Sequence, residues 1–211
     1  MNAQTLRQAV RGPAGDIECA IDAPNGTSIG TAVICHPHPL HGGTLDNKVV
    51  QTLARVCVQL GWRSVRFNFR GVGASQGEWD VGAGEVNDCL AVIAALREPN
   101  LPLMFAGFSF GAYVAAEASH RLVALAKAQR LVLVGPSTQK QQLPEVPPDT
   151  LVIHGESDDV VPLSATLDWA RPQALPVIVF PGVGHFFHGQ LTLLKRVLLR
   201  ELQGGASQAA G

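Results

Sequence analysis

Residues Leu103 to Ala116 read L-M-F-A-G-F-S-F-G-A-Y-V-A-A, an apolar run that is interrupted between Gly107 and Gly111. The part before the interruption is typical of a buried strand, and the small-residue part after it is typical of a helix. Ser109 lies within the interruption, in the pattern G-x-S-x-G. A serine in such a turn projects its hydroxyl from the strand end, where the helix N-terminus can stabilise an oxyanion. We therefore interpret Ser109 as a candidate nucleophile, although the same pattern outside a strand and a helix indicates only a turn.

Strand and helix patterns alternate from about residue 31 to the end of the chain. Apolar runs predict strands, and apolar residues at helical spacing predict helices. The predicted elements are an opening hairpin of 17–21 with 31–35, strands at 63–69, 103–107, 131–134, 151–154 and 177–180, and helices at 47–60, 85–96, 111–126, 163–170 and 190–202. This alternation predicts an α/β fold with a mostly parallel central sheet and helices on both faces.

Partners for Ser109 are expected at the carboxyl ends of other strands, where sites in such sheets lie. A serine hydroxyl needs an imidazole to take its proton, and that imidazole needs a carboxylate to orient it. The loop after 151–154 reads G-E-S-D-D-V-V-P, and the loop after 177–180 reads P-G-V-G-H-F-F-H-G. An acid in the first loop and His185 in the second follow Ser109 in the chain order expected for this kind of nucleophile.

These segments together resemble the α/β-hydrolase superfamily over nearly the whole chain. G-F-S-F-G is similar to the family's nucleophile elbow, H-G-E-S-D-D-V-V-P to its acid loop and G-H-F-F to its histidine loop. The resemblance implies that Asp158 is the acid, with Asp159 as the competitor, and that Ser109 and His185 are the other catalytic residues. The stretch H-P-H-P-x-x-G-G, followed by D-N-K, resembles a compact subgroup of single-domain enzymes without a lid.

The resemblance also implies an oxyanion hole, with one donor from the residue after the nucleophile, here Phe110. A second donor is expected from the loop at 36–43, in which the prolines have no N–H. We expect His38 to be this donor, with Leu40 as the alternative. Leu40, Phe108 and Phe186 are also predicted to border the substrate pocket.

Three of the seven histidines, His36, His38 and His41, form an H-x-H-x-x-H pattern that could indicate a metal site. Prolines stiffen this loop, and no nearby carboxylate or cysteine pattern completes a ligand set, so we expect no metal there. His120 and His154 are expected to be structural or solvated. His188 is expected to lie at a helix start beside Gly189, with a place in the pocket lining as the alternative.

Length and composition place further bounds on the class of protein. The 211 residues predict one domain at 1–203 with a disordered tail at 204–211. Sixteen basic and 17 acidic residues, without a basic stripe, argue against nucleic-acid partners. No apolar stretch is long enough for membrane insertion, and the four cysteines are scattered, so we expect a soluble cytoplasmic protein with reduced, structural thiols.

The expected activity is that of a serine hydrolase that cleaves small carboxylic esters or thioesters through an acyl-enzyme, with no cofactor. The segment between the strands at 131–134 and 151–154 is too short for a helical lid, so we expect a shallow, open site and no preference for long-chain lipids. Three alternatives remain: a peptidase or acyltransferase with the same triad, a non-catalytic binding protein with the same fold, and a metal-dependent hydrolase.

Overall fold

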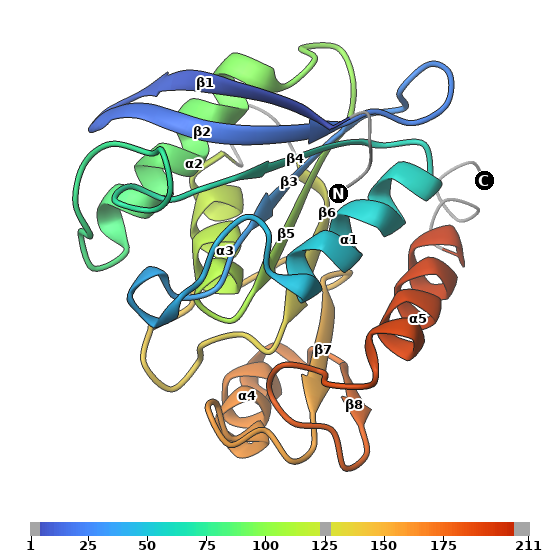
Figure 1. Ribbon diagram of the computed structural model, residues 1–211. Coiled ribbons are helices and arrows are strands. Elements are labelled where there is room, and N and C mark those ends of the chain that lie inside the picture. Colours follow the sequence, from blue (N-terminus) through green and yellow to red (C-terminus); the bar gives the residue numbers. More distant parts are fainter. Residues whose placement is uncertain (1–4, 123–127, 205–211) are drawn as a thin grey trace.

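A central sheet of eight strands in the order β1-β2-β4-β3-β5-β6-β7-β8 runs through the computed structural model, which describes residues 5–122 and 128–204 (Figure 1). The strands are β1 (Leu6–Gly12), β2 (Gly15–Asp22), β3 (Thr31–Cys35), β4 (Arg63–Phe67), β5 (Leu103–Phe108), β6 (Ala128–Val134), β7 (Leu151–Gly155) and β8 (Val177–Phe180). The pairs from β4 through β3 to β8 are parallel, and only β1–β2 and β2–β4 are antiparallel among the described strands. The predicted mostly parallel sheet is therefore confirmed.

Helices cover both faces of the sheet (Figure 1). They are α1 (Lys48–Gln59), α2 (Ala83–Leu96), α3 (Phe110–Leu122), α4 (Leu163–Ala170) and α5 (Leu191–Gly204), with short 3-10 turns η1 (Pro39–His41) and η2 (Arg171–Gln173). Side chains of α1 and α5, such as Leu53 and Leu198, form a buried cluster with Ile34 of β3. Side chains of α2 and α3 form a second cluster on the other face, around Phe105 of β5. The strands between the two clusters are buried on both faces, which explains their continuous apolar sequences.

The predicted hairpin of residues 17–21 with 31–35 is wrong. β2 pairs instead with β1, a strand that the sequence analysis missed, and with β4. Residues 13–14 make the tight turn between β1 and β2, whereas the link at 23–30 is longer than the two to about five residues of an ordinary hairpin loop. That longer link carries the chain past β4, so that β3 lies between β4 and β5.

The connection from β6 to β7 contains neither a helix nor a strand, so no lid domain is inserted among the described residues. The helix after Ser109, α3, is described as far as Leu122, and its predicted extension to about residue 126 lies outside the described residues. The final helix runs two residues further than predicted, to Gly204. The disorder expected for 204–211 concerns residues that, except for Gly204, lie outside the described part.

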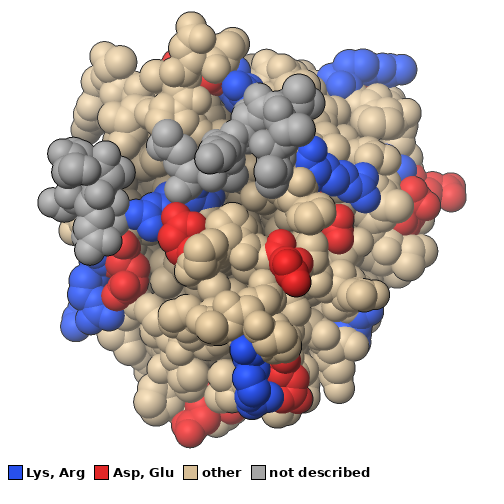
Figure 2. All heavy atoms as spheres, turned by 180° about the vertical axis from the view of Figure 1, so that it is seen from behind, with Lys and Arg blue, Asp and Glu red and all other residues tan. Residues whose placement is uncertain are grey.

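Charged side chains are dispersed over the face shown in Figure 2, where several blue groups lie next to red ones. All four cysteines are buried and none forms a disulfide, as expected. No described helix is long and apolar enough to cross a membrane.

Candidate active site

Ser109 occupies a strained turn between β5 and α3. Its φ angle is 57°, a left-handed conformation that is uncommon for residues other than glycine. Gly107 and Gly111 permit the turn: a Cβ at Gly107 would collide with the backbone oxygen of Gly111, and a Cβ at Gly111 would collide with the backbone oxygen of Cys35 at the end of β3. The Ser109 N–H donates to the oxygen of Val134 at 2.9 Å, which ties the turn to β6.

Ser109, His185 and Asp158 form one hydrogen-bonded chain. The Oγ atom of Ser109 lies 3.0 Å from Nε2 of His185, and Nδ1 of His185 lies 2.7 Å from Oδ2 of Asp158. Asp158 follows β7 and His185 follows β8, so the three side chains meet at the carboxyl ends of their strands. Asp159, the competing acid, is exposed, and Asp158 is the carboxylate that contacts His185.

The surroundings of Asp158 stabilise its ionised form. Burial acts to raise the pKa of this carboxyl, but the hydrogen bond from His185 and those from the N–H groups of Val161 and Val160 outweigh it and hold the pKa below its ordinary value. The two backbone donors lie 2.7 and 2.9 Å from Oδ1. Oδ1 is thus bound to its own loop, and Oδ2 is directed toward the imidazole.

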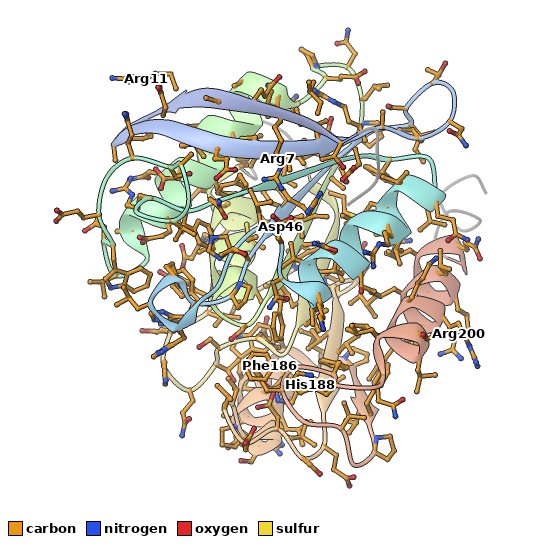
Figure 3. All side chains as sticks on the ribbon, viewed as in Figure 1. Arg7, Arg11, Asp46, Phe186, His188 and Arg200 are labelled. Atoms are coloured by element: carbon orange, nitrogen blue, oxygen red, sulfur yellow. The ribbon has the colours of Figure 1, made fainter. Side chains whose placement is uncertain are left out.

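Two aromatic rings hold the His185 imidazole in place. Phe108 packs against it at a centroid distance of 4.9 Å, and Phe186 packs edge to face at 5.1 Å. Phe108 is fully buried, so its predicted position at the substrate pocket is not found: it lies under the imidazole. Phe186 is 45% exposed and lies beside His188 on the loop before α5 (Figure 3).

A cleft of about 560 Å³ opens beside His185. Its lining comes from the acid loop and the histidine loop, and it includes Asp159, Phe186 and His188. The side chains of the candidate nucleophile and base are recessed, since Ser109 is 7% exposed and His185 is 2% exposed. The site is therefore less shallow than the sequence analysis suggested, although no lid domain is found among the described residues.

The loop after β3 contains His38 and Leu40, the two residues considered as the second oxyanion donor. Within the described part of the chain, the N–H groups of Phe110 and His38 donate no hydrogen bond, so both remain available. The Leu40 N–H instead donates to Nδ1 of His38 at 3.3 Å, and the Leu40 side chain is 66% exposed. This difference favours His38 over Leu40 as the second donor. The His38 ring packs against Trp79 at 4.6 Å, an aromatic neighbour that the sequence did not indicate.

His36 does not combine with His38 and His41 into a ligand set. Its Nε2 accepts the N–H of Phe69 at 3.0 Å, and its Nδ1 donates to the oxygen of Pro37 at 2.6 Å. Both ring nitrogens are therefore occupied, and burial lowers the pKa of His36 to about 3. No group of three potential ligands that could hold a metal ion is found among residues 5–122 and 128–204.

His154 lies closer to the site than the sequence analysis predicted. It was expected to be structural or solvated, and it is fully buried, with Nε2 3.3 Å from Oδ2 of Asp158. Its position at the end of β7, four residues before the acid, is the one signal in the sequence that could have placed it there. Because no pattern in a single sequence distinguishes it from other strand-end histidines, its contact with Asp158 emerges only from the structure.

Comparisons with known proteins agree with this fold. A family model described as serine aminopeptidase, S33, matches residues 32–149, more than half of the chain. XC6422 from Xanthomonas campestris, an α/β serine hydrolase without a lid, is 35% identical, with a TM-score of 0.86 over 96% of this chain and 95% of that one. An α/β serine hydrolase homologue from Coxiella burnetii is 39% identical, with a TM-score of 0.81 over 96% of this chain and 98% of that one.

A sequence relative, the uncharacterized protein RP471 of Rickettsia prowazekii, is 42% identical over 107 residues. That match covers 49% of this chain and 45% of the relative, so it spans less than half of the relative's length. The family model and the two similar structures, which are matched over nearly their whole length, show that the chain belongs to the α/β serine hydrolases.

Proposed function

We propose that this hydrolase cleaves small carboxylic esters or thioesters through an acyl-enzyme intermediate. The observation that carries the proposal is the hydrogen-bonded chain from Ser109 through His185 to Asp158, with distances of 3.0 and 2.7 Å. These separations lie within the range over which a histidine can accept a serine proton and a carboxylate can orient the histidine.

In the proposed reaction, Nε2 of His185 takes the hydroxyl proton as Oγ of Ser109 attacks the acyl carbon. The carbonyl oxygen becomes an oxyanion and accepts hydrogen bonds from the N–H groups of Phe110 and His38. His185 then gives the proton to the leaving alcohol or thiol, and the acyl–oxygen bond to Ser109 remains. Water, activated by the same imidazole, hydrolyses that bond and restores the serine. These reaction steps require no metal and no cofactor.

The absence of a lid domain among the described residues supports small substrates. An uncovered site offers little apolar wall for a long acyl chain. His185 is among the residues that line the cleft, so we place the leaving group there. Leu40, on the exposed loop after β3, and Phe186, at the rim of this cleft, are the residues that we propose to contact substrate. The four unpaired, buried cysteines support a reducing location such as the cytoplasm.

An aminopeptidase is the second candidate because the family model that matches the chain carries that description. Asp159 lines the cleft and could attract a peptide's ammonium group. Amino-acid p-nitroanilides and p-nitrophenyl esters distinguish the two activities, because both release a coloured product from the same triad. Turnover of the esters with no measurable turnover of the anilides supports the esterase, whereas ready turnover of the anilides supports the peptidase.

Replacing Ser109 with alanine tests the nucleophile. We expect Ser109→Ala to lower p-nitrophenyl acetate turnover by about 10³-fold or more and to abolish labelling by a fluorophosphonate. Ser64→Ala is a matched control, since Ser64 is buried in β4 and its hydroxyl has no hydrogen-bond partner among the described residues. Failure of the folded wild-type protein to react with the probe at Ser109 would instead favour a non-catalytic binding protein.

A further inference from the structure

The side chains of both proposed oxyanion donors pack against one indole ring, that of Trp79. Its ring centroid lies 4.6 Å from that of His38 and 4.9 Å from that of Phe110. The rings of His38 and Phe110 also contact each other, at a centroid distance of 5.3 Å. His38 belongs to the loop after β3, Phe110 begins α3, and Trp79 lies in the loop between β4 and α2. Three segments that are far apart in the sequence therefore meet beside the proposed oxyanion hole.

The two donors differ in how firmly their own segments hold them. Phe110 is almost completely buried at the start of a helix. His38 lies instead in a loop whose following residues 40–42 are exposed. The carbonyl oxygen of His38 accepts hydrogen bonds from the N–H groups of His41 and Gly43, both at 3.1 Å. These bonds fix the carbonyl of His38, so the orientation of its N–H depends on the packing of its ring.

The loop that carries Trp79 is held in place by Glu85, a completely buried side chain in the first turn of α2. Its carboxylate accepts the N–H of Asp80 at 2.9 Å and the N–H of Gly82 at 2.7 Å. Between these two residues, Val81 has a φ of 52°, a left-handed conformation that is strained for a β-branched residue. The Val81 side chain is 76% exposed, so its own burial does not offset this strain. The hydrogen bonds to the carboxylate therefore fix the loop directly after Trp79 in a conformation that its sequence does not favour.

We infer that Trp79 is a positioning residue, which holds the N–H groups of His38 and Phe110 at the separation needed to bind one oxyanion. The inference rests on the proposed function, in which Ser109 is the nucleophile. Two donors stabilise a developing oxyanion only when both are directed at the position that the oxygen will occupy. The indole contacts both side chains, and it thereby fixes the exposed loop of His38 relative to the buried start of α3.

Two substitutions of Trp79 separate this role from simple packing. Trp79→Leu keeps an apolar side chain but removes the aromatic ring, whereas Trp79→Phe keeps a ring that can pack on both donors. The control is Trp169→Leu. Trp169, in α4, is half-buried like Trp79, and both indoles pack against the same apolar cluster around Phe105.

The first measurement is the NMR order parameter of the His38 amide in the whole protein. We expect it to lie near about 0.85 in the wild type, as for a rigid backbone, and to fall toward about 0.6 in Trp79→Leu. Trp79→Phe should restore a value close to that of the wild type, because the ring contact with His38 is kept. Trp169→Leu should leave the order parameter of His38 unchanged.

The second measurement is inhibition by a trifluoromethyl ketone, which reports oxyanion binding. Oγ of Ser109 adds to the carbonyl carbon of the ketone, His185 takes the hydroxyl proton, and the carbonyl oxygen becomes an oxyanion. We expect the inhibition constant to rise about tenfold in Trp79→Leu and to stay within about threefold of the wild type in Trp79→Phe. kcat/KM for p-nitrophenyl acetate should fall by the same factors, because the adduct resembles the transition state. Trp169→Leu should change neither value.

The two proposals fail in different ways. The positioning role is overturned if the His38 order parameter or the ketone inhibition is unchanged in Trp79→Leu, or if Trp169→Leu produces equal changes. A folded wild-type protein that forms no ketone adduct and does not react with a fluorophosphonate overturns the proposed hydrolysis. The order parameter does not depend on turnover, so in that case it still decides whether Trp79 holds the loop of His38.

Discussion

The two sides of Ser109 are built from the same residue type in opposite electrostatic environments. On the acid side, the loops after β7 and β8 bring His185 and His154 against the ionised carboxylate of Asp158. On the side of the proposed oxyanion loop, His36 is buried among backbone groups and the ring of Phe69, and no carboxylate of the described residues contacts it. Both His36 and His154 are fully buried, and burial lowers the pKa of each ring, whereas the carboxylate of Asp158 beside His154 acts in the opposite direction without outweighing that burial. The difference teaches that a neighbouring carboxylate moderates the effect of burial on a histidine but does not replace it.

The largest expected effect follows from removing the negative charge of Asp158. Asp158→Asn should lower kcat/KM for p-nitrophenyl acetate by about 10³- to 10⁴-fold, because the amide cannot hold the imidazole in the required tautomer or stabilise its cation. Asp159→Asn is the matched control, since that side chain is exposed, and it should retain activity within about threefold. Equal losses in the two variants would contradict the assignment of the acid.

An intermediate effect concerns the neutral histidine of the oxyanion side. The pKa of His36 is about 3 in the folded protein, whereas an unfolded histidine has its model value of 6.5. Below pH 6.5 the unfolded chain therefore binds a proton at His36 that the folded chain does not bind. The free energy of unfolding consequently falls as the pH decreases from about 6.5 toward 3. Between pH 7 and pH 5 this one side chain should reduce the free energy of unfolding by about 2 kcal/mol.

Urea unfolding at both pH values measures this effect. The loss between pH 7 and pH 5 should be about 2 kcal/mol smaller in His36→Gln than in the wild type, because the other titrating groups contribute equally to both. His120→Gln provides the control, since His120 is exposed. An equal pH dependence in wild type and His36→Gln would show that His36 accepts a proton in the fold.

The smallest expected effect is that of the His38 side chain, whose proposed role lies in its backbone. His38→Ala keeps the N–H but removes the ring that accepts from Leu40 and packs on Trp79. We expect kcat/KM to fall by about three- to tenfold, the result of one lost hydrogen bond in a loop. A loss as large as that in Asp158→Asn would mean that the imidazole itself takes part in the reaction.

The parts of the fold that could be predicted from the sequence are those determined by residues close together in the chain. The turn at Ser109 and the apolar strands of the parallel sheet depend on neighbouring residues, and they are found where expected. The pairing of β2 was mispredicted because strand partners depend on how far a link can reach, and β1 was missed because only Val10 of its seven residues is buried. The contact of His154 with Asp158 also depends on tertiary packing, since α4 supplies its partner Thr166.

The two glycines that flank Ser109 look equivalent in the sequence, but different neighbours exclude a side chain at each of them. Gly107 is required by the tight turn around Ser109 itself, because a side chain at Gly107 would collide with the backbone of Gly111. Gly111 is required by another segment, because its neighbours are the backbone oxygens of Cys35 and His36. The second glycine thus sets how closely the nucleophile helix can approach the loop that carries His38. In a relative with a larger residue at that position, the nucleophile could keep its turn while the oxyanion loop moved away from it.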